Sequence, residues 1–263
     1  MSLRSILELL ANGRISVDEA ESRIKLFVLK KISEKIQLDV GREHRIGIPE
    51  IILAEYKDCE ELKSAVLEMV EERGRAIVTR LKKNQRPVIE SFKDSYNVHI
   101  SSTGRIAVIK KRDFKVEFLG GRIGIVTAGT ADVPLAEEVK VIVEEFGCKA
   151  FTIYDAGIAG LHRTVEALKF LHENDVDVIV VIAGMEGALP SVIKALTDLP
   201  VIGLPASKGY GLGGEGQAAL LSMLQSCTPG LVVVNIDNSL GAAVAAVSIA
   251  LRVARFRKKG DSD

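Results

Sequence analysis

The sequence is poor in cysteine and has no excess of charge of either sign, and each shortage argues against a class of protein. Its 263 residues include three cysteines, far apart and without a C-x-x-C pair, so neither a disulfide framework nor a zinc site is predicted. Its 35 basic side chains are matched by 35 acidic ones, whereas a nucleic-acid-binding surface needs a basic surplus. We therefore expect a cytoplasmic protein with no nucleic-acid partner.

Long apolar runs and common nucleotide-binding motifs are also missing. The first twenty residues lack the apolar core and cleavage site of a signal peptide. No uncharged apolar run reaches the roughly 18 residues that span a membrane, and the nearest one, residues 240–251, is predicted to be a buried helix without a membrane partner. The sequence has no G-x-x-x-x-G-K-[ST] and no well-placed G-x-G-x-x-G, which argues against ordinary ATPases and Rossmann dehydrogenases. A solvated helix end is predicted for the basic residues Arg252, Arg255, Arg257, Lys258 and Lys259.

Glycine divides the chain unevenly, with five glycines in residues 1–118 and eighteen in residues 119–263. We predict two domains with these bounds. In the first, apolar spacing after a capping box at Ser16 predicts an amphipathic helix over residues 17–36, and a second helix is expected over 60–72. Short strands over 76–79 and 105–110, the latter in a hairpin with 115–119, complete a smaller, mainly helical domain.

The second half alternates short β-branched runs with helical stretches. The runs are nearly all apolar, which is typical of strands that are covered on both faces. They occupy residues 123–127, 150–154, 176–182, 201–204 and 231–236. This pattern predicts a doubly wound α/β domain with a parallel sheet of about five strands. Ligands bind beyond the carboxyl ends of such strands, so the turns there form the candidate site.

These turns are rich in small residues, which let backbone N–H groups approach a phosphate closely. Residues 209–216 contain five glycines in eight positions, and we predict a mobile lid or a close backbone cradle there. Lys208, just before this segment, has two open interpretations: it neutralises an anionic ligand, or it is a solvated side chain.

Glu186 and Cys227 are the candidate reactive groups, each with a second interpretation. Glu186 directly follows an apolar run, where a partly desolvated carboxylate could transfer protons near neutral pH; it could equally be an acidic residue at a helix start. Cys227 lies before the last strand, and a lone cysteine is more often a small buried apolar residue than a nucleophile.

Several long strings resemble one family. The resemblance to LarB, the nickel-pincer-nucleotide biosynthesis carboxylases, rests on AGMEGALPSVIKALTDLPVIGLPASKGYG, LLSMLQSCTPG, VVVNIDNSLGAA, YDAGIAGLHR and REHRIGIPEIILAE. LarB is itself similar to the PurE aminoimidazole ribonucleotide carboxylases and mutases, so a PurE-like, flavodoxin-like three-layer fold is implied. PurE proteins have a catalytic histidine at the position of Ala188, while Glu186 and Cys227 match the catalytic carboxylate and cysteine of LarB.

The resemblance implies a carboxylase and hydrolase that acts on nicotinic acid adenine dinucleotide. CO2 or bicarbonate supplies a carboxyl group for C5 of the pyridinium ring, and phosphoanhydride cleavage releases AMP and pyridinium-3,5-dicarboxylate mononucleotide. Addition of the Cys227 thiolate at C4 makes C5 nucleophilic, and Glu186 then removes the C5 proton. The dinucleotide is the substrate, so no tightly bound organic cofactor is expected.

Further residue roles follow from the same resemblance. Two carboxylates, Asp155 and Asp237, could hold Mg2+ on the phosphates, or cap the helices that follow. PurE relatives form octamers, so a homo-oligomer is expected by analogy. Binding of the nucleotide and its phosphates is expected at Gly129, Thr130, Asp132, Gly184, Gly187, Ser207, Lys208, Gly209, Gly211 and Asn238.

Two alternatives remain open at this point. One is a PurE-like enzyme that acts on aminoimidazole ribonucleotide, against which Ala188 argues. The other is a nucleotide-binding module without catalysis, against which the combination of Cys227 and Glu186 argues.

Overall fold

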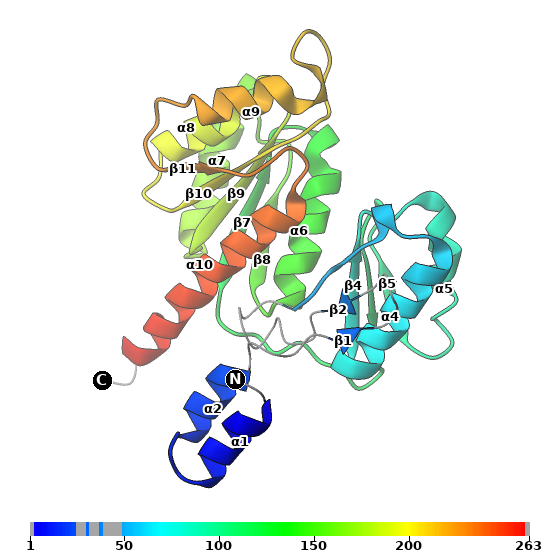
Figure 1. Cartoon of the computed structure of the whole chain (residues 1–263). Helices are drawn as coiled ribbons and strands as arrows, with labels where there is room; N and C mark the ends of the chain where they lie inside the picture. Colours follow the sequence, from blue (N-terminus) through cyan, green and yellow to red (C-terminus); the bar gives the residue numbers. More distant parts are fainter. Residues whose placement is uncertain (1–2, 25–29, 32–36, 39–48, 261–263) are drawn as a thin grey trace. The chain divides into compact units, whose positions relative to one another are not determined.

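A computed structural model of the protein describes residues 3–24, 30–31, 37–38 and 49–260 (Figure 1). The chain forms two compact units, Met1–Phe114 and Lys115–Asp263. Each unit has a hydrophobic core of its own.

The second unit contains the predicted parallel sheet. Its five strands are β7 (Arg122–Thr127), β8 (Lys149–Ile153), β9 (Val178–Ala183), β10 (Val201–Pro205) and β11 (Leu231–Val233). All pair in parallel, in the order β11-β10-β9-β7-β8. The predicted doubly wound α/β fold is thereby confirmed, although β11 ends three residues before the predicted run does.

Helices cover both faces of this sheet because its strands are apolar on both sides. One face is covered by α6 (Val133–Glu145) and α10 (Ser239–Gly260), which also pack against each other. The other face carries α7 (Leu161–Glu173), α8 (Leu189–Ala195) and α9 (Gln217–Leu224). The strand order reverses between β7 and β9, so the crevice beyond their carboxyl ends is where this topology places a ligand.

The last helix is longer than the sequence pattern predicts. It has 22 residues, and over Ser239–Arg257 it is long and apolar enough to cross a membrane by length and composition. Its alanine-rich face packs against α6, β7, β9 and β10, as the predicted buried helix requires. That face consists of Ala242, Ala243, Ala246, Val247, Ala250 and Ala254.

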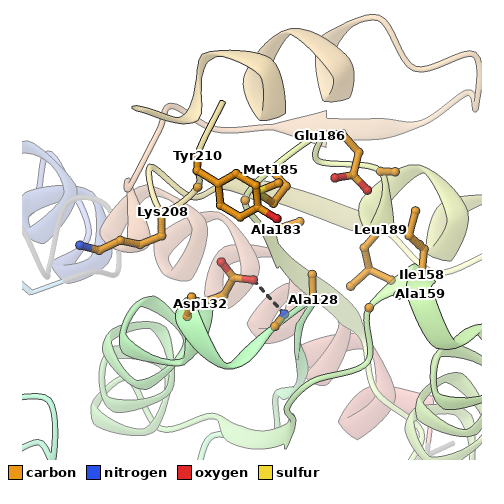
Figure 2. A pocket seen from close by; sticks show the side chains of 16 residues that line it. Ala128, Asp132, Ile158, Ala159, Ala183, Met185, Glu186, Leu189, Lys208 and Tyr210 are labelled. Atoms are coloured by element: carbon orange, nitrogen blue, oxygen red, sulfur yellow. Dashed lines mark hydrogen bonds between the residues drawn. The ribbon is translucent and has the colours of Figure 1, made fainter. Parts of the chain in front are cut away.

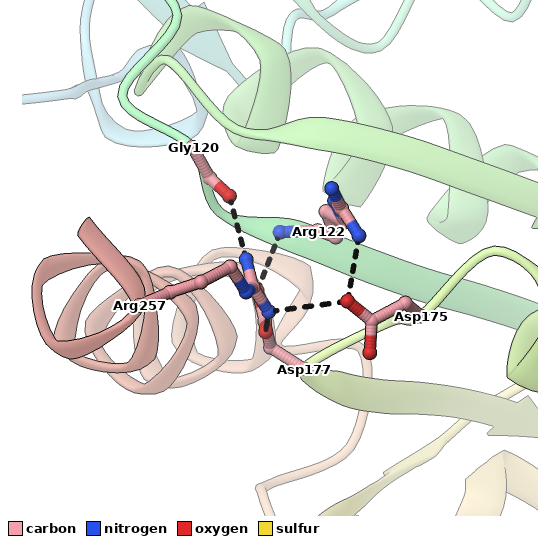
Figure 3. Close-up of polar contacts among 5 residues, drawn as sticks. All are labelled: Gly120, Arg122, Asp175, Asp177 and Arg257. Atoms are coloured by element: carbon pink, nitrogen blue, oxygen red, sulfur yellow. Dashed lines mark hydrogen bonds and ion pairs between the residues drawn. The ribbon is translucent and has the colours of Figure 1, made fainter. Parts of the chain in front are cut away.

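Arg257 corrects the expectation of a fully solvated basic helix end, because it is anchored in an ion network (Figure 3). Its guanidinium donates to the Asp177 carboxylate and to the Gly120 carbonyl. Asp177 also accepts the backbone N–H of Arg122 at 2.7 Å, while the Arg122 side chain pairs with Asp175 at 2.7 Å. The network therefore ties the end of α10 to the beginnings of β7 and β9. Among the other basic residues, Arg252 lies over the Phe256 ring, and the side chains of Lys258 and Lys259 are outside the described residues.

Replacing Asp177 by asparagine is expected to lower the free energy of unfolding by about 2 kcal/mol. Breaking a fully buried pair costs roughly 3–5 kcal/mol, and the value here is lower because Arg257 keeps 31% of its side-chain surface while Asp177 keeps 1%. Urea denaturation would measure the change. Asp175→Asn is the matched control in the same network: Asp175 is 69% exposed, so its loss should change stability by less than about 0.5 kcal/mol. Equal losses for both variants would contradict the prediction.

The first unit is a mixed α/β unit whose sheet is larger than the sequence indicated. Its four-stranded sheet has the order β3-β4-β6-β5. The strands are β3 (Ile52–Leu53), β4 (Arg75–Thr79), β5 (Asn97–Ile100) and β6 (Ala107–Lys110), and the helices are α1 (Leu3–Ala11), α2 (Val17–Ile24), α4 (Cys59–Arg73) and α5 (Arg86–Glu90). A separate two-stranded sheet pairs β1 (Lys30–Lys31) with β2 (Gln37–Leu38). In the core, buried residues of α4 pack against β4 and β6.

Two local predictions in this unit are wrong. The helix that begins after Ser16, whose hydroxyl accepts the Glu19 N–H, does not extend to residue 36, because Lys30–Lys31 is a strand. Residues 25–29, 32–36 and 39–48 are outside the described part of the chain. The expected hairpin of 105–110 with 115–119 does not form either, since β6 pairs with β4 and β5 instead. The predicted helix over 60–72 is confirmed as α4, with a capping box at Asp58.

Candidate functional site

A cavity of about 450 Å³ lies beyond the carboxyl ends of the sheet, at the point where the strand order reverses (Figure 2). It is built from the turns that follow β7, β8, β9 and β10, as the topology predicts. Small and apolar residues form most of its wall. The lining consists of Ala128, Gly129, Ala131, Asp132, Gly157, Ile158, Ala159, Ala183, Gly184, Met185, Glu186, Ala188, Leu189, Lys208, Gly209 and Tyr210.

Asp132 is the buried ionisable group of this cavity. Its side chain is fixed by the turn after β7, because its Oδ2 accepts the Gly129 N–H at 3.0 Å. Burial raises the pKa of Asp132 from 3.8 to about 6; N–H groups of Gly129 and Gly184 oppose this effect, and the charge of Asp237 adds to it. The carboxyl group can therefore change its protonation state close to neutral pH.

This raised pKa gives stability a defined dependence on pH. The folded chain holds the Asp132 proton more tightly than the unfolded chain, so the contribution of this group to stability is fully present below pH 4 and is lost as the pH rises through about 6. For two pKa units the loss is about 3 kcal/mol at most. In the Asp132→Asn variant this pH-dependent part of the free energy of unfolding should vanish. The amide also loses one of the contacts that the carboxylate makes with backbone N–H groups. Urea denaturation from pH 4 to 8 measures it, and parallel profiles for the two proteins would contradict the assignment.

The backbone at this edge of the sheet is strained at three positions. Asp155, Met185 and Asp237 adopt φ angles of 58°, 51° and 54°, in turns that follow β8, β9 and β11. Left-handed conformations are unfavourable for residues with a Cβ atom, and least unusual for Asp and Asn. Strain of this kind tends to gather at functional sites, so its concentration here supports the choice of site.

Two lining glycines allow neighbouring turns to touch through their backbones. A Cβ atom on Gly157 would lie 2.5 Å from the Ala128 carbonyl oxygen, and one on Gly184 would lie 2.2 Å from that of Lys208. Gly184 therefore allows the two turns to pack closely, a role that was not predicted beside its expected contact with phosphate.

The polar side chains at the rim point to different ends of the cavity. Figure 2 shows Lys208 at one end and Glu186 at the other, with Tyr210 and Met185 between them. Glu186 is exposed, so the partial desolvation expected from the sequence is not present in the single chain. Tyr210 is 82% exposed and was not predicted; the signal for it was an aromatic residue inside a glycine-rich segment.

The structure brings six of the predicted binding and catalytic residues into the wall of the cavity. The six are Gly129, Asp132, Gly184, Glu186, Lys208 and Gly209. Of the others, Asn238 caps α10 by accepting the Gly241 N–H at 2.9 Å. The lining does not include the rest of the predicted nucleotide-binding set, which is Thr130, Gly187, Ser207 and Gly211.

The two carboxylates considered for Mg2+ are each held by donors of the protein. Asp155 pairs with Arg163 of α7. Asp237 accepts the Ser207 N–H at 2.9 Å and the Ser207 hydroxyl at 2.5 Å, which joins the turns after β10 and β11. Throughout the described residues, no three His, Cys, Asp or Glu side chains are grouped as metal ligands usually are. The magnesium site stays a prediction.

Cys227 lies outside the wall of the cavity. It is exposed, in the loop that leads from α9 into the amino end of β11. This loop is attached to α8 by the Thr228 hydroxyl, which donates to the Ser191 carbonyl at 3.3 Å. The predicted nucleophile and the predicted base are therefore not brought together within the cavity of one chain.

Two family models match the chain, one for each unit. The model described as AIR carboxylase matches residues 122–259. The model described as LarB/PurE-like N-terminal domain matches residues 30–111.

The known proteins that match this chain differ in how much of it they cover. An uncharacterized protein of Methanocaldococcus jannaschii is 44% identical over 95% of this chain and 97% of its own length. The N5-carboxyaminoimidazole ribonucleotide mutase of Pyrococcus horikoshii is 35% identical over 48% of this chain and 71% of its own length. The mutase of the same name from M. jannaschii is 35% identical over 52% of this chain and 84% of its own.

Proposed function

The chain belongs to the LarB/PurE-like family, and on that premise we propose that it carboxylates the pyridinium ring of nicotinic acid adenine dinucleotide at C5 and releases AMP. Its PurE-like relatives are carboxylases and mutases, so it is an enzyme of that general kind. The observation that carries the finer proposal is the chemistry of the cavity wall. The wall contains Glu186 and Ala188 and, among the described residues, no histidine. An alanine thus stands where the PurE resemblance would place a histidine, and the ionisable side chain of this turn is Glu186.

The cavity wall suits a flat cationic ring attached to a nucleotide. Met185, Ile158 and Leu189 offer apolar contacts, while Glu186 offers a negative charge that favours a pyridinium ion. Asp132 is nearly buried below them. We infer that its carboxylate accepts a hydrogen bond from a ribose hydroxyl. Lys208 at the far end is the cation available for a phosphate.

The proposed carboxylation needs neither an oxidant nor a reductant. The thiolate of Cys227 forms a bond to C4 and converts the pyridinium ion to a dihydropyridine, whose C5 is an enamine carbon. C5 then attacks CO2, and Glu186 takes the proton that C5 still carries. Loss of the thiolate from C4 restores the aromatic ring. The net change replaces the C5 hydrogen by a carboxylate and releases one proton, and water separately cleaves the phosphoanhydride.

The position of Cys227 adds a requirement to this scheme. Because the thiol lies outside the cavity wall of its own chain, we assign the thiol that acts on each cavity to a second copy in a homo-oligomer. Closed oligomers of identical chains present the same loop to each neighbour, so every cavity would be completed in the same way.

The test is incubation of the purified chain with nicotinic acid adenine dinucleotide and ¹³C-bicarbonate, followed by mass spectrometry. The proposal expects AMP together with a mononucleotide that carries one labelled carboxyl group. Conversion of aminoimidazole ribonucleotide instead, with no change in the dinucleotide, would favour a PurE-like activity. No turnover of either by folded protein would leave a nucleotide-binding module.

A further inference from the structure

The N-terminal unit has a polar cavity that the proposed reaction does not use. The cavity has a volume of about 340 Å³ and lies between α5, the segment that follows α5, and β5 with its following turn. Nitrogen and hydroxyl donors make up much of its wall. The lining consists of Arg86, Glu90, Lys93, Val98, His99, Ile100, Ser101 and Gly104.

Arg86 is the central residue of this cavity. Its Nη2 donates to the Thr103 carbonyl at 3.2 Å, while its Nε is buried and has no hydrogen-bond acceptor. Among the residues that the structure describes, the Arg86 side chain is hydrogen-bonded to the Thr103 carbonyl and no carboxylate pairs with it. A permanently charged, partly buried guanidinium is expensive to keep unless an anion compensates it.

The turn after β5 is shaped around this guanidinium. Gly104 has a φ angle of 67°, and a Cβ atom there would lie 1.8 Å from Arg86 Nη2. The Ser101 hydroxyl lies 3.1 Å from that of Thr103, in the same turn. The guanidinium is thus held in place by backbone and is not a free surface side chain.

The other charged residues of the wall leave a positive balance. Lys93 has its carboxylate neighbour, Glu90, at 3.8 Å, and both side chains are more than half exposed, so their pairing is weak. His99, on the edge strand β5, also lines the cavity. Basic residues therefore line the cavity from α5, from the segment after it and from β5.

We propose that this cavity binds a tetrahedral oxyanion, either free phosphate or the phosphate group of a small metabolite. A phosphate offers oxygens in several directions, which matches basic residues on three elements, whereas a planar carboxylate could engage fewer of them. Lys93 can leave Glu90 and bind the anion, since their contact is long and exposed. The proposal assigns a ligand to the unit that does not carry the carboxylation site.

Hydrogen–deuterium exchange of the full chain, read by mass spectrometry, tests this site separately from the other. Inorganic phosphate is expected to slow exchange in peptides covering residues 86–104, and titration of that protection gives an apparent Kd. Titrating AMP in parallel distinguishes the two sources, since a nucleotide site protects these peptides at lower AMP than phosphate concentration. Protection confined to peptides of Lys115–Asp263 would overturn the proposal.

Variants on the cavity wall should move this Kd in opposite directions. Arg86→Gln should weaken phosphate binding at least about tenfold and Lys93→Gln about threefold, while Glu90→Gln should tighten it about threefold by removing repulsion. Lys63→Gln, an exposed lysine on α4 outside the wall, is the matched control and should leave the Kd unchanged. Glu90 and Lys93 are exposed, so their variants remain informative if Arg86→Gln fails to fold. An unchanged Kd in both, or no saturation below about 10 mM phosphate, would refute the site.

Discussion

Replacing Cys227 by alanine is expected to lower the rate of carboxylation at least about 1000-fold while dinucleotide binding persists. Without a nucleophile at C4 the ring stays an electron-poor pyridinium ion, and C5 cannot attack CO2. Binding should survive because Cys227 does not line the cavity. Rates of AMP and carboxylated product formation, together with calorimetric titration of the dinucleotide, measure the two effects. Retained carboxylation would exclude covalent catalysis by this thiol.

The other two cysteines supply controls. Cys59→Ala, on α4 of the N-terminal unit, should leave the carboxylation rate unchanged. Cys148 is buried, and burial raises its pKa to about 12, so it stays a protonated thiol that reacts poorly with alkylating agents. Treatment with an alkylating agent should therefore abolish activity through modification of the exposed Cys227.

A mixture of two inactive variants tests where the thiol comes from. Chains with Cys227→Ala keep Glu186, and chains with Glu186→Gln keep the thiol. If each cavity receives its thiol from another copy, co-assembly at equal amounts should restore about a quarter of the activity. A mixture that stays inactive although the chains have exchanged would assign the thiol to its own chain.

Replacing Gly184 by alanine is expected to lower the free energy of unfolding by about 2–3 kcal/mol and to reduce activity at least about 100-fold. The new Cβ atom would lie 2.2 Å from the Lys208 carbonyl oxygen. This oxygen belongs to the backbone, so it cannot move away as the end of a flexible side chain can. The turns after β9 and β10 must therefore separate. Their separation displaces Glu186 and Lys208, which lie at the two ends of the cavity. Urea denaturation and product formation measure the two losses.

Gly129→Ala is the matched control, because it alters another glycine of the same cavity wall. The new Cβ atom would lie 3.9 Å from Asp132 Oδ2, which is an ordinary contact, and Gly129 has an extended backbone with φ −137°. Stability should therefore change by less than about 0.5 kcal/mol. Similar losses of stability in the two variants would show that Gly184 is not needed for close backbone approach.

The sheet of the second unit was predictable because its strands are nearly continuous apolar runs. Strands buried on both faces have this pattern, and the order of strands and helices then leaves few possible topologies. The sheet of the first unit was harder to predict. Its edge strand β5, which was not predicted, alternates exposed Asn97 and His99 with half-buried Val98 and Ile100. The strands predicted over 76–79 and 105–110 correspond to β4 and β6, but β6 was assigned the wrong partner because its pairing with β4 is distant in sequence.

In the candidate site, position along the chain predicted more than residue type did. Glu186, Lys208 and Asp132 line the cavity because each follows a strand of the sheet. The packing role of Gly184 depends on the carbonyl of Lys208, and the ion pair of Asp155 depends on Arg163, so neither could be known before the turns were placed. Cys227 precedes its strand, and its order in the sequence already placed it near the amino end of β11.

The left-handed backbone of Met185 has a consequence for how this chain can vary. At a φ angle of 51° a glycine or asparagine would be the less strained choice, by about 1 kcal/mol or more. Laboratory evolution for heat resistance alone should therefore drift away from methionine at this position. Evolution for turnover should retain methionine if its thioether contacts the substrate, so the two selections would diverge at a single codon.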